Sequence, residues 1–113
     1  MATIPEEINN RIWLNCRELI NLVNIAKSTE YRLFRAYNER QDTIEDLDEL
    51  TNLALDVTNS DQRLTTITIR TATAKLQADN ATATMLEETM DYIETRIPAW
   101  SRSIEEVVNN WGL

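Results

Sequence analysis

Two groups of carboxylates are the side chains of this sequence best suited to chemistry. Magnesium prefers oxygen ligands and tolerates a site without histidine, so two acidic helical segments that face each other could hold it. One group lies in the segment 45–49 and the other in the segment 87–94. Their members are Glu45, Asp46, Asp48, Glu49, Glu87, Glu88, Asp91 and Glu94.

The spacing inside these groups resembles the metal-binding halves of a known enzyme family. Glu88 and Asp91 have the ExxD spacing of the all-α nucleotide pyrophosphohydrolases of the MazG kind, and Glu45 with Asp48 is a loose version of their ExxE half. The resemblance covers about eight residues, and Asp48 stands where that family has a glutamate. It implies a magnesium-dependent nucleotide pyrophosphohydrolase as the alternative function.

A simpler interpretation explains the same carboxylates without an enzyme. Acidic side chains solvate helix surfaces and stabilise helix N-termini through the helix dipole. The chain has no histidine, which excludes Ser-His-Asp and Cys-His catalysis and the usual His-containing zinc and di-iron sites. The one cysteine, Cys16, falls on an apolar face, where a buried thiol is expected. We therefore predict no catalytic residue, no metal site and no cofactor.

Basic and aromatic side chains alternate in the segment 27–40, a pattern that can bind nucleic acid. The formal net charge of −8 opposes phosphate binding, and Phe34 and Tyr37 fit an apolar stripe. We therefore predict core packing here and no direct nucleic-acid binding. Glu30 lies on the same stripe, and because a buried carboxylate needs a partner, we expect it to pair with an arginine of a neighbouring helix. The segment contains Lys27, Tyr31, Arg32, Phe34, Arg35, Tyr37 and Arg40.

The three tryptophans lie on or beside apolar stripes, so a core position is expected for each. Trp111 is two residues from the end of the sequence, where a single chain offers few neighbours, and tryptophan is enriched at protein interfaces. We therefore predict that the segment from Ile104 to Trp111 packs in an oligomer or against a partner. The predicted contact residues are Ile104, Val107, Val108 and Trp111.

The elements that position these residues follow from glycine and proline scarcity and from apolar spacing. Pro5, Pro98 and Gly112 are the only residues of these two types, which argues against a β-sandwich or barrel. Apolar residues recur three and four positions apart in the blocks 12–37, 50–85 and 86–111. This spacing predicts helices over about 6–41, 43–79 and 84–111, with Ile8, Trp13, Ile20 and Phe34 widening the first stripe.

Turn chemistry suggests where these helices begin and end. Pro5 suits a helix start. Asp42 with Glu45, or Thr43 with Asp46, offers a capping box for the second helix, and Thr84 with Glu87 offers one for the third. A change of register predicts a turn within 77–82. Pro98 predicts a kink or a break.

The predicted fold is all-α: a single domain over 1–113 forming an antiparallel, coiled-coil-like bundle of three long amphipathic helices. Two alternatives remain open. One is a four-helix arrangement with a break near Asn59, and the other is an open dimer with a single long helix over 43–97.

The charge is uneven, with a net +1 over residues 1–41 and −9 over residues 42–113. The N-terminus lacks a secretory pattern and no apolar run is long enough to span a membrane, so a cytoplasmic location is expected. These features favour a non-enzymatic helical interaction module, either an adaptor, a scaffold or a small acidic regulatory inhibitor. We expect it to form homo-oligomers and to bind a protein partner.

Overall fold

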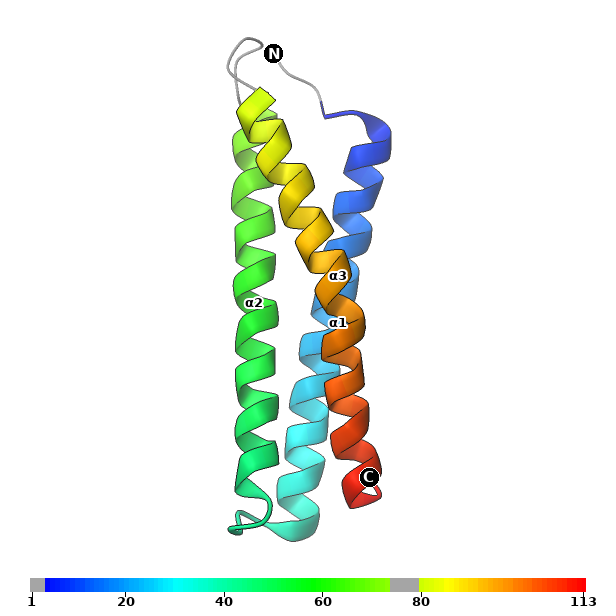
Figure 1. Cartoon of the computed structure of the whole chain (residues 1–113), viewed down its shortest axis with the longest axis vertical. Coiled ribbons are helices and arrows are strands. Elements are labelled where there is room, and N and C mark those ends of the chain that lie inside the picture. Colours follow the sequence, from blue (N-terminus) through cyan, green and yellow to red (C-terminus); the bar gives the residue numbers. More distant parts are fainter. Residues whose placement is uncertain (1–3, 74–79) are drawn as a thin grey trace.

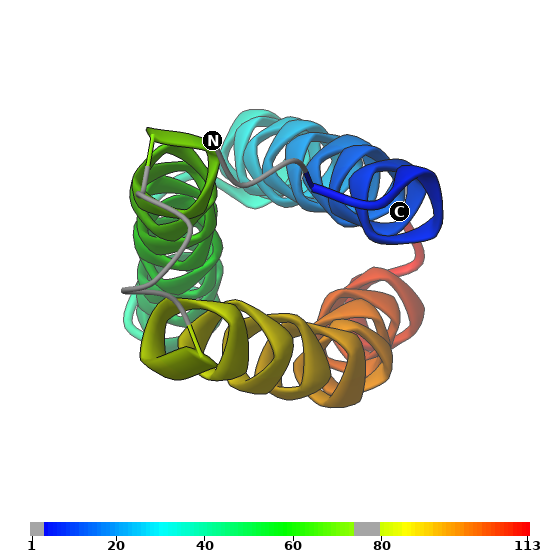
Figure 2. The ribbon, with the colours of Figure 1, turned by 90° about the horizontal axis from the view of Figure 1, so that it is seen from above.

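A computed structural model of the protein describes residues 4–73 and 80–113, of which Asn80 is described by its backbone only. Three helices make up the fold: α1 (Glu6–Tyr37), α2 (Ile44–Thr73) and α3 (Asn80–Trp111). Consecutive helices run antiparallel to each other, and the molecule measures 56 × 20 × 17 Å (Figure 1). Seen along the long axis, they surround a common centre, and each contacts the other two (Figure 2).

This arrangement confirms the antiparallel three-helix bundle and decides against both alternatives. Helix α2 passes through Asn59 without a break, as the continuous apolar spacing there predicts. A single helix over 43–97 is wrong because α3, which begins at Asn80, packs back against α2.

The core follows the predicted stripes closely in α3 and only partly in α1. Six of the eight α3 stripe positions are buried, and the remaining two, Ile97 and Trp111, pack against the core. In α1 the row Ile12, Leu19, Ala26 and Leu33 is buried as predicted.

The predicted widening of the α1 stripe is wrong for three of its four members. Ile8 packs against the core, but Trp13, Ile20 and Phe34 are exposed. The buried face widens instead in the opposite direction around the helix, through Asn15, Leu22 and Thr29. The sequence pattern contains apolar residues on both flanks, and the positions of α2 and α3 decide which flank is covered.

The helix boundaries differ from the predicted ones for local reasons. Helix α1 ends at Tyr37 rather than near residue 41 because Asn38 adopts φ 61°, a left-handed conformation that asparagine tolerates. Helix α3 begins at Asn80 rather than near 84, so Thr84 lies within the helix and 80–82 are helical. The rest of the predicted turn, and the predicted end of the second helix at 79, lie outside the described residues.

Pro98 does not break α3, which continues from Asn80 to Trp111. Proline cannot donate a hydrogen bond to residue 94 and crowds its carbonyl. Pro98 is exposed, so the carbonyl that loses its donor can be hydrated. Figure 1 shows the axis of α3 changing direction in its middle part, in agreement with the predicted kink. The predicted break is wrong, because the helix is continuous through Pro98.

The C-terminal end of α3 is closed by a glycine cap. Gly112 follows the last helical residue and has φ 61°. The backbone N–H of Leu113 donates to the carbonyl of Val108 at 3.0 Å, which satisfies one of the last free carbonyls of the helix.

Threonines are accommodated inside the helices by bonding to their own backbone. Each of five hydroxyls donates to the carbonyl four residues earlier, which satisfies the polar atom without a partner from another helix. These residues are Thr58, Thr71, Thr73, Thr89 and Thr95.

Candidate interaction surface

The predicted C-terminal contact residues lie against the chain's own core. Ile104 and Val107 are buried, while Val108 and Trp111 are partly buried and pack on the core. The two buried members therefore have no surface left for a second chain. Whether the segment also contacts another copy remains a prediction.

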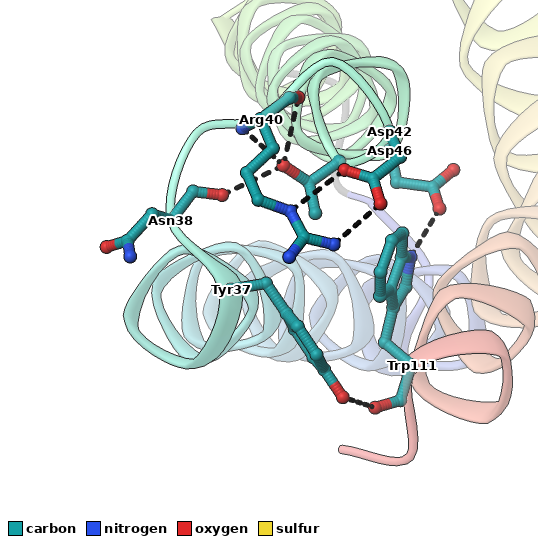
Figure 3. Close-up of polar contacts among 7 residues, drawn as sticks. Tyr37, Asn38, Arg40, Asp42, Asp46 and Trp111 are labelled. Atoms are coloured by element: carbon teal, nitrogen blue, oxygen red, sulfur yellow. Dashed lines mark hydrogen bonds and ion pairs between the residues drawn. The ribbon is translucent and has the colours of Figure 1, made fainter.

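Trp111 joins all three helices at the end of the bundle. Its indole Nε1 donates to Asp46 Oδ2 of α2 at 2.7 Å, and its carbonyl accepts from the Tyr37 hydroxyl of α1 at 2.9 Å. The rings of Tyr37 and Trp111 lie 4.9 Å apart between centroids (Figure 3). The neighbours that Trp111 was expected to find in another chain are thus supplied by the end of α1 and the start of α2.

Thr43 organises that turn, which Figure 3 shows beside Trp111. Its fully buried hydroxyl accepts the backbone N–H of Arg40 at 2.9 Å and donates to the carbonyl of Asn38 at 2.8 Å. The Arg40 guanidinium binds the Asp42 carboxylate at 2.6 Å and lowers its pKa. The predicted capping box of Thr43 with Asp46 is wrong, because the hydroxyl is committed to the turn and Asp46 to Trp111.

The two carboxylate groups of the pyrophosphohydrolase-like motif lie at different levels of the bundle. Because α2 and α3 are antiparallel, Glu88 lines the same groove as Asn59. Asn59 is roughly 20 Å along α2 from Asp46 at 1.5 Å per residue. Among the described residues, no three acidic or cysteine side chains come together to hold a metal ion.

Two of these carboxylates instead form an ion-pair network with α1. Arg11 donates to Asp91 Oδ1 and Glu94 Oε2, each at 2.6 Å, and Asn15 donates to Glu94 Oε2 at 2.9 Å. The hydrogen bonds from Arg11 lower the pKa of Glu94, and Asn15 lowers it further. The same contacts raise the pKa of Arg11. This network fixes the register of α1 on α3 and satisfies the buried Asn15 amide.

Glu30 is paired differently from the expectation. Its carboxylate binds Lys27 on the same helix at 3.1 Å and accepts from the Thr51 hydroxyl of α2 at 3.0 Å. The predicted pairing of Glu30 with an arginine of a neighbouring helix is wrong. Glu30 lies at the margin of the core, where Lys27 of the same helix can pair with it.

Cys16 is partly buried between α1 and α2, as a cysteine on the flank of the core should be. Burial raises the pKa of its thiol, and the nearby Asp61 carboxylate raises it further. The thiol is therefore protonated near neutral pH and a poor nucleophile.

An acidic groove of ≈ 500 Å³ lies between α2 and α3. Its walls carry Glu45, Asp48, Glu49 and Asp56. Arg96 and Trp100 also line it, with the guanidinium 5.4 Å from the indole centroid. Within the described residues, the buried Nε of Arg96 and Nε1 of Trp100 have no hydrogen-bond partner. The groove therefore combines four carboxylates with one guanidinium.

A second surface, which the sequence interpretation assigned to the core, lies on the outside of α1. Seven residues spaced alternately four and three apart are all exposed along this face. Four of them are large and apolar or aromatic, with exposed fractions of 67% for Trp13, 55% for Ile20, 60% for Tyr31 and 48% for Phe34. We call this set the α1 outer stripe; its members are Trp13, Arg17, Ile20, Asn24, Lys27, Tyr31 and Phe34.

The α1 outer stripe borders two grooves shared with α2. Ile20 and Asn24 line one beside Thr58 and Asp61. Lys27, Tyr31 and Phe34 line the other, beside Asp48 and Thr51. A seven-residue repeat through 13, 20, 27 and 34 is visible in the sequence. Each of its positions follows directly after one of the core row, so helical spacing alone does not separate the exposed row from the buried one.

No family model, curated protein or solved structure matches the chain. Among the described residues, no helix has the combination of length and apolar composition needed to cross a membrane.

Proposed function

We propose that the protein is a non-enzymatic helical interaction module, an adaptor or scaffold, that self-associates through the α1 outer stripe. The observation that carries this proposal is the exposure of three aromatic side chains on one continuous helix face: Trp13, Tyr31 and Phe34, with Ile20 between them. Exposed apolar patches rimmed by polar residues mark interaction sites. Tryptophan and tyrosine also dominate the energetics of interfaces.

The distribution of charge supports the same function. Net charge is +1 over residues 1–41 and −9 over residues 42–113, so the surface of α1 is the least acidic part of the protein. Acidic flanks set association rate and partner choice more than affinity. The carboxylate contacts also favour this proposal over catalysis, since Asp91 of the enzyme-like motif and the nearby Glu94 bind Arg11, and Asp46 accepts from Trp111.

The test compares two tyrosines with similar exposure on different helices. Tyr31 lies in the α1 outer stripe and is 60% exposed, whereas Tyr92 lies on α3 and is 56% exposed. We expect Tyr31→Ser to weaken self-association roughly fivefold or more, because losing an interface anchor costs over about 1 kcal/mol. Tyr92→Ser should leave it unchanged. Sedimentation velocity over a wide range of protein concentration measures both.

A wild-type chain that stays monomeric at every concentration would contradict self-association. The salt dependence separates a scaffold from an acidic inhibitor. Association through apolar side chains should persist as salt rises, whereas an inhibitor that works by charge should lose binding steeply.

A further inference from the structure

We infer that the α1 outer stripe binds the same stripe of a second copy in antiparallel orientation, with the two-fold axis close to Asn24. This inference rests on the proposed self-association and specifies its geometry. A two-fold contact uses one patch twice, so the patch must complement itself. The stripe meets this requirement because its aromatic side chains lie toward both ends and its polar residues, Asn24 and Lys27, lie near the middle.

Charge decides between the two orientations. In a parallel pair, Arg17 would lie opposite Arg17 of the second copy, and Lys27 opposite Lys27, with like charges in contact. In an antiparallel pair centred near Asn24, Arg17 of each copy reaches the level of Tyr31 and Phe34 of the other. There it meets aromatic rings that favour cations and the groove that contains Asp48.

The charges in question are available for this contact. Among the described residues, neither Arg17 nor Asp48 takes part in an ion pair within its own chain. Lys27 is already neutralised by Glu30 at 3.1 Å, which reduces repulsion near the centre of the pair. The antiparallel contact therefore places each Arg17 beside the groove that contains Glu30, Glu39 and Asp48, and these carboxylates offset the nearby Arg35, which donates to the Tyr31 hydroxyl at 3.0 Å.

The area of the stripe suits a dimer of ordinary size. An aromatic side chain contributes on the order of 150–250 Å², so the exposed parts of Trp13, Ile20, Tyr31 and Phe34 offer roughly 500 Å². A standard interface buries about 800 Å² per partner. The stems of Arg17 and Lys27 and the neighbouring surface of α2, including Thr51 and Thr58, lie beside the stripe and can supply the difference.

Single cysteines placed in a Cys16→Ser chain test the geometry by disulfide formation under a mild oxidant. Asn24→Cys should give a covalent dimer, because residue 24 lies near its own copy at the axis. Arg17→Cys alone should not, because the two copies of residue 17 lie roughly 20 Å apart along the helices at 1.5 Å per residue. A mixture of Arg17→Cys and Tyr31→Cys chains should give the mixed dimer. Gln62→Cys, exposed on α2, is the control and should stay monomeric.

The outcomes separate this inference from the proposed function. Efficient cross-linking of Arg17→Cys to itself would show a parallel pair and overturn the inference. Sedimentation that shows dimers while Asn24→Cys forms no disulfide would place the contact elsewhere, for example in the acidic groove, and also overturn it. In both cases self-association stands. A chain that remains monomeric in sedimentation and forms no disulfide overturns both.

Discussion

The C-terminal turn of α3 and the outer stripe of α1 both carry tryptophan at helical spacing, yet only the first is covered. Trp111 packs on Tyr37, bonds to Asp46 and closes one end of the bundle. Trp13 is 67% exposed. The sequence predicts the reverse, an interface at Trp111 and a core flank at Trp13. The difference teaches that a tryptophan on the last turn of a helix is covered when the ends of the neighbouring helices lie beside it, as those of α1 and α2 do beside Trp111.

The largest expected effect comes from comparing two adjacent residues on the two faces of α1. Leu19 is fully buried and Ile20 lies in the outer stripe. Leu19→Ala should lower the free energy of unfolding by about 2–5 kcal/mol, because it leaves a cavity among three helices. Ile20→Ala should change the stability of the monomer by less than about 0.5 kcal/mol.

Urea unfolding at low protein concentration measures both values. Equal losses of stability in the two variants would mean that Ile20 is also part of the core. If only Ile20→Ala weakens association in sedimentation experiments, the two faces of α1 have separate roles, one in stability and one in association.

An intermediate effect is expected when the two tryptophans are each changed to phenylalanine. Trp111→Phe removes the donor to Asp46, and leaving that partly buried carboxylate with one fewer partner should cost about 1–3 kcal/mol of stability. Trp13→Phe should cost less than about 0.5 kcal/mol. Thermal unfolding of the two variants at the same low concentration provides the measurement. A stable Trp111→Phe chain would show that the indole contact is dispensable.

The smallest effect concerns the ion pairs of Arg11, which hold α1 to α3. Because Arg11 lowers the pKa of Glu94, the ionised carboxylate stabilises the folded chain above its unfolded pKa of about 4.3. That stabilisation is lost as the pH falls through the lower folded pKa. Glu94 is solvent-exposed, so the contribution should stay below about 1 kcal/mol.

Thermal melts of the wild type and of Glu94→Gln, compared between pH 6 and pH 3, isolate this contribution. The wild type should lose more stability over this range than the variant, and the gap between them should close toward the acid end. Parallel curves for the two proteins would show that the network makes no net contribution. Glu105→Gln, changed at an exposed position of the same helix, is the matched control.

Much of the fold was readable from the sequence because its determinants are local. The spacing of Leu50, Val57 and Leu64 carries α2 through Asn59, and the eight-residue stripe of α3 faces the core throughout. The predicted end of α1 was wrong because the observed end depends on the backbone conformation of Asn38 and on the hydrogen bond that the Thr43 hydroxyl donates. Apolar spacing carries no information about either.

The candidate site was less accessible to sequence reasoning. The carboxylate groups were visible, but the ion pair of Glu94 with Arg11 and the hydrogen bond of Asp46 with Trp111 depend on which residues α1 brings to α3 and on how the start of α2 meets the end of α3. The exposure of Trp13 depends likewise on neighbours that lie far away in the sequence.

The sequence by itself determined three amphipathic helices, their antiparallel order and most of the buried rows, because hydrophobic spacing and glycine scarcity act within each segment. The tertiary structure decided which of two apolar flanks of α1 is covered, since Asn15 and Leu22 face the other helices while Trp13 and Ile20 do not. A helix with two apolar flanks can turn either one inward. The packing of α2 and α3 against α1 determines which flank is buried, and the other flank remains exposed and available to a partner.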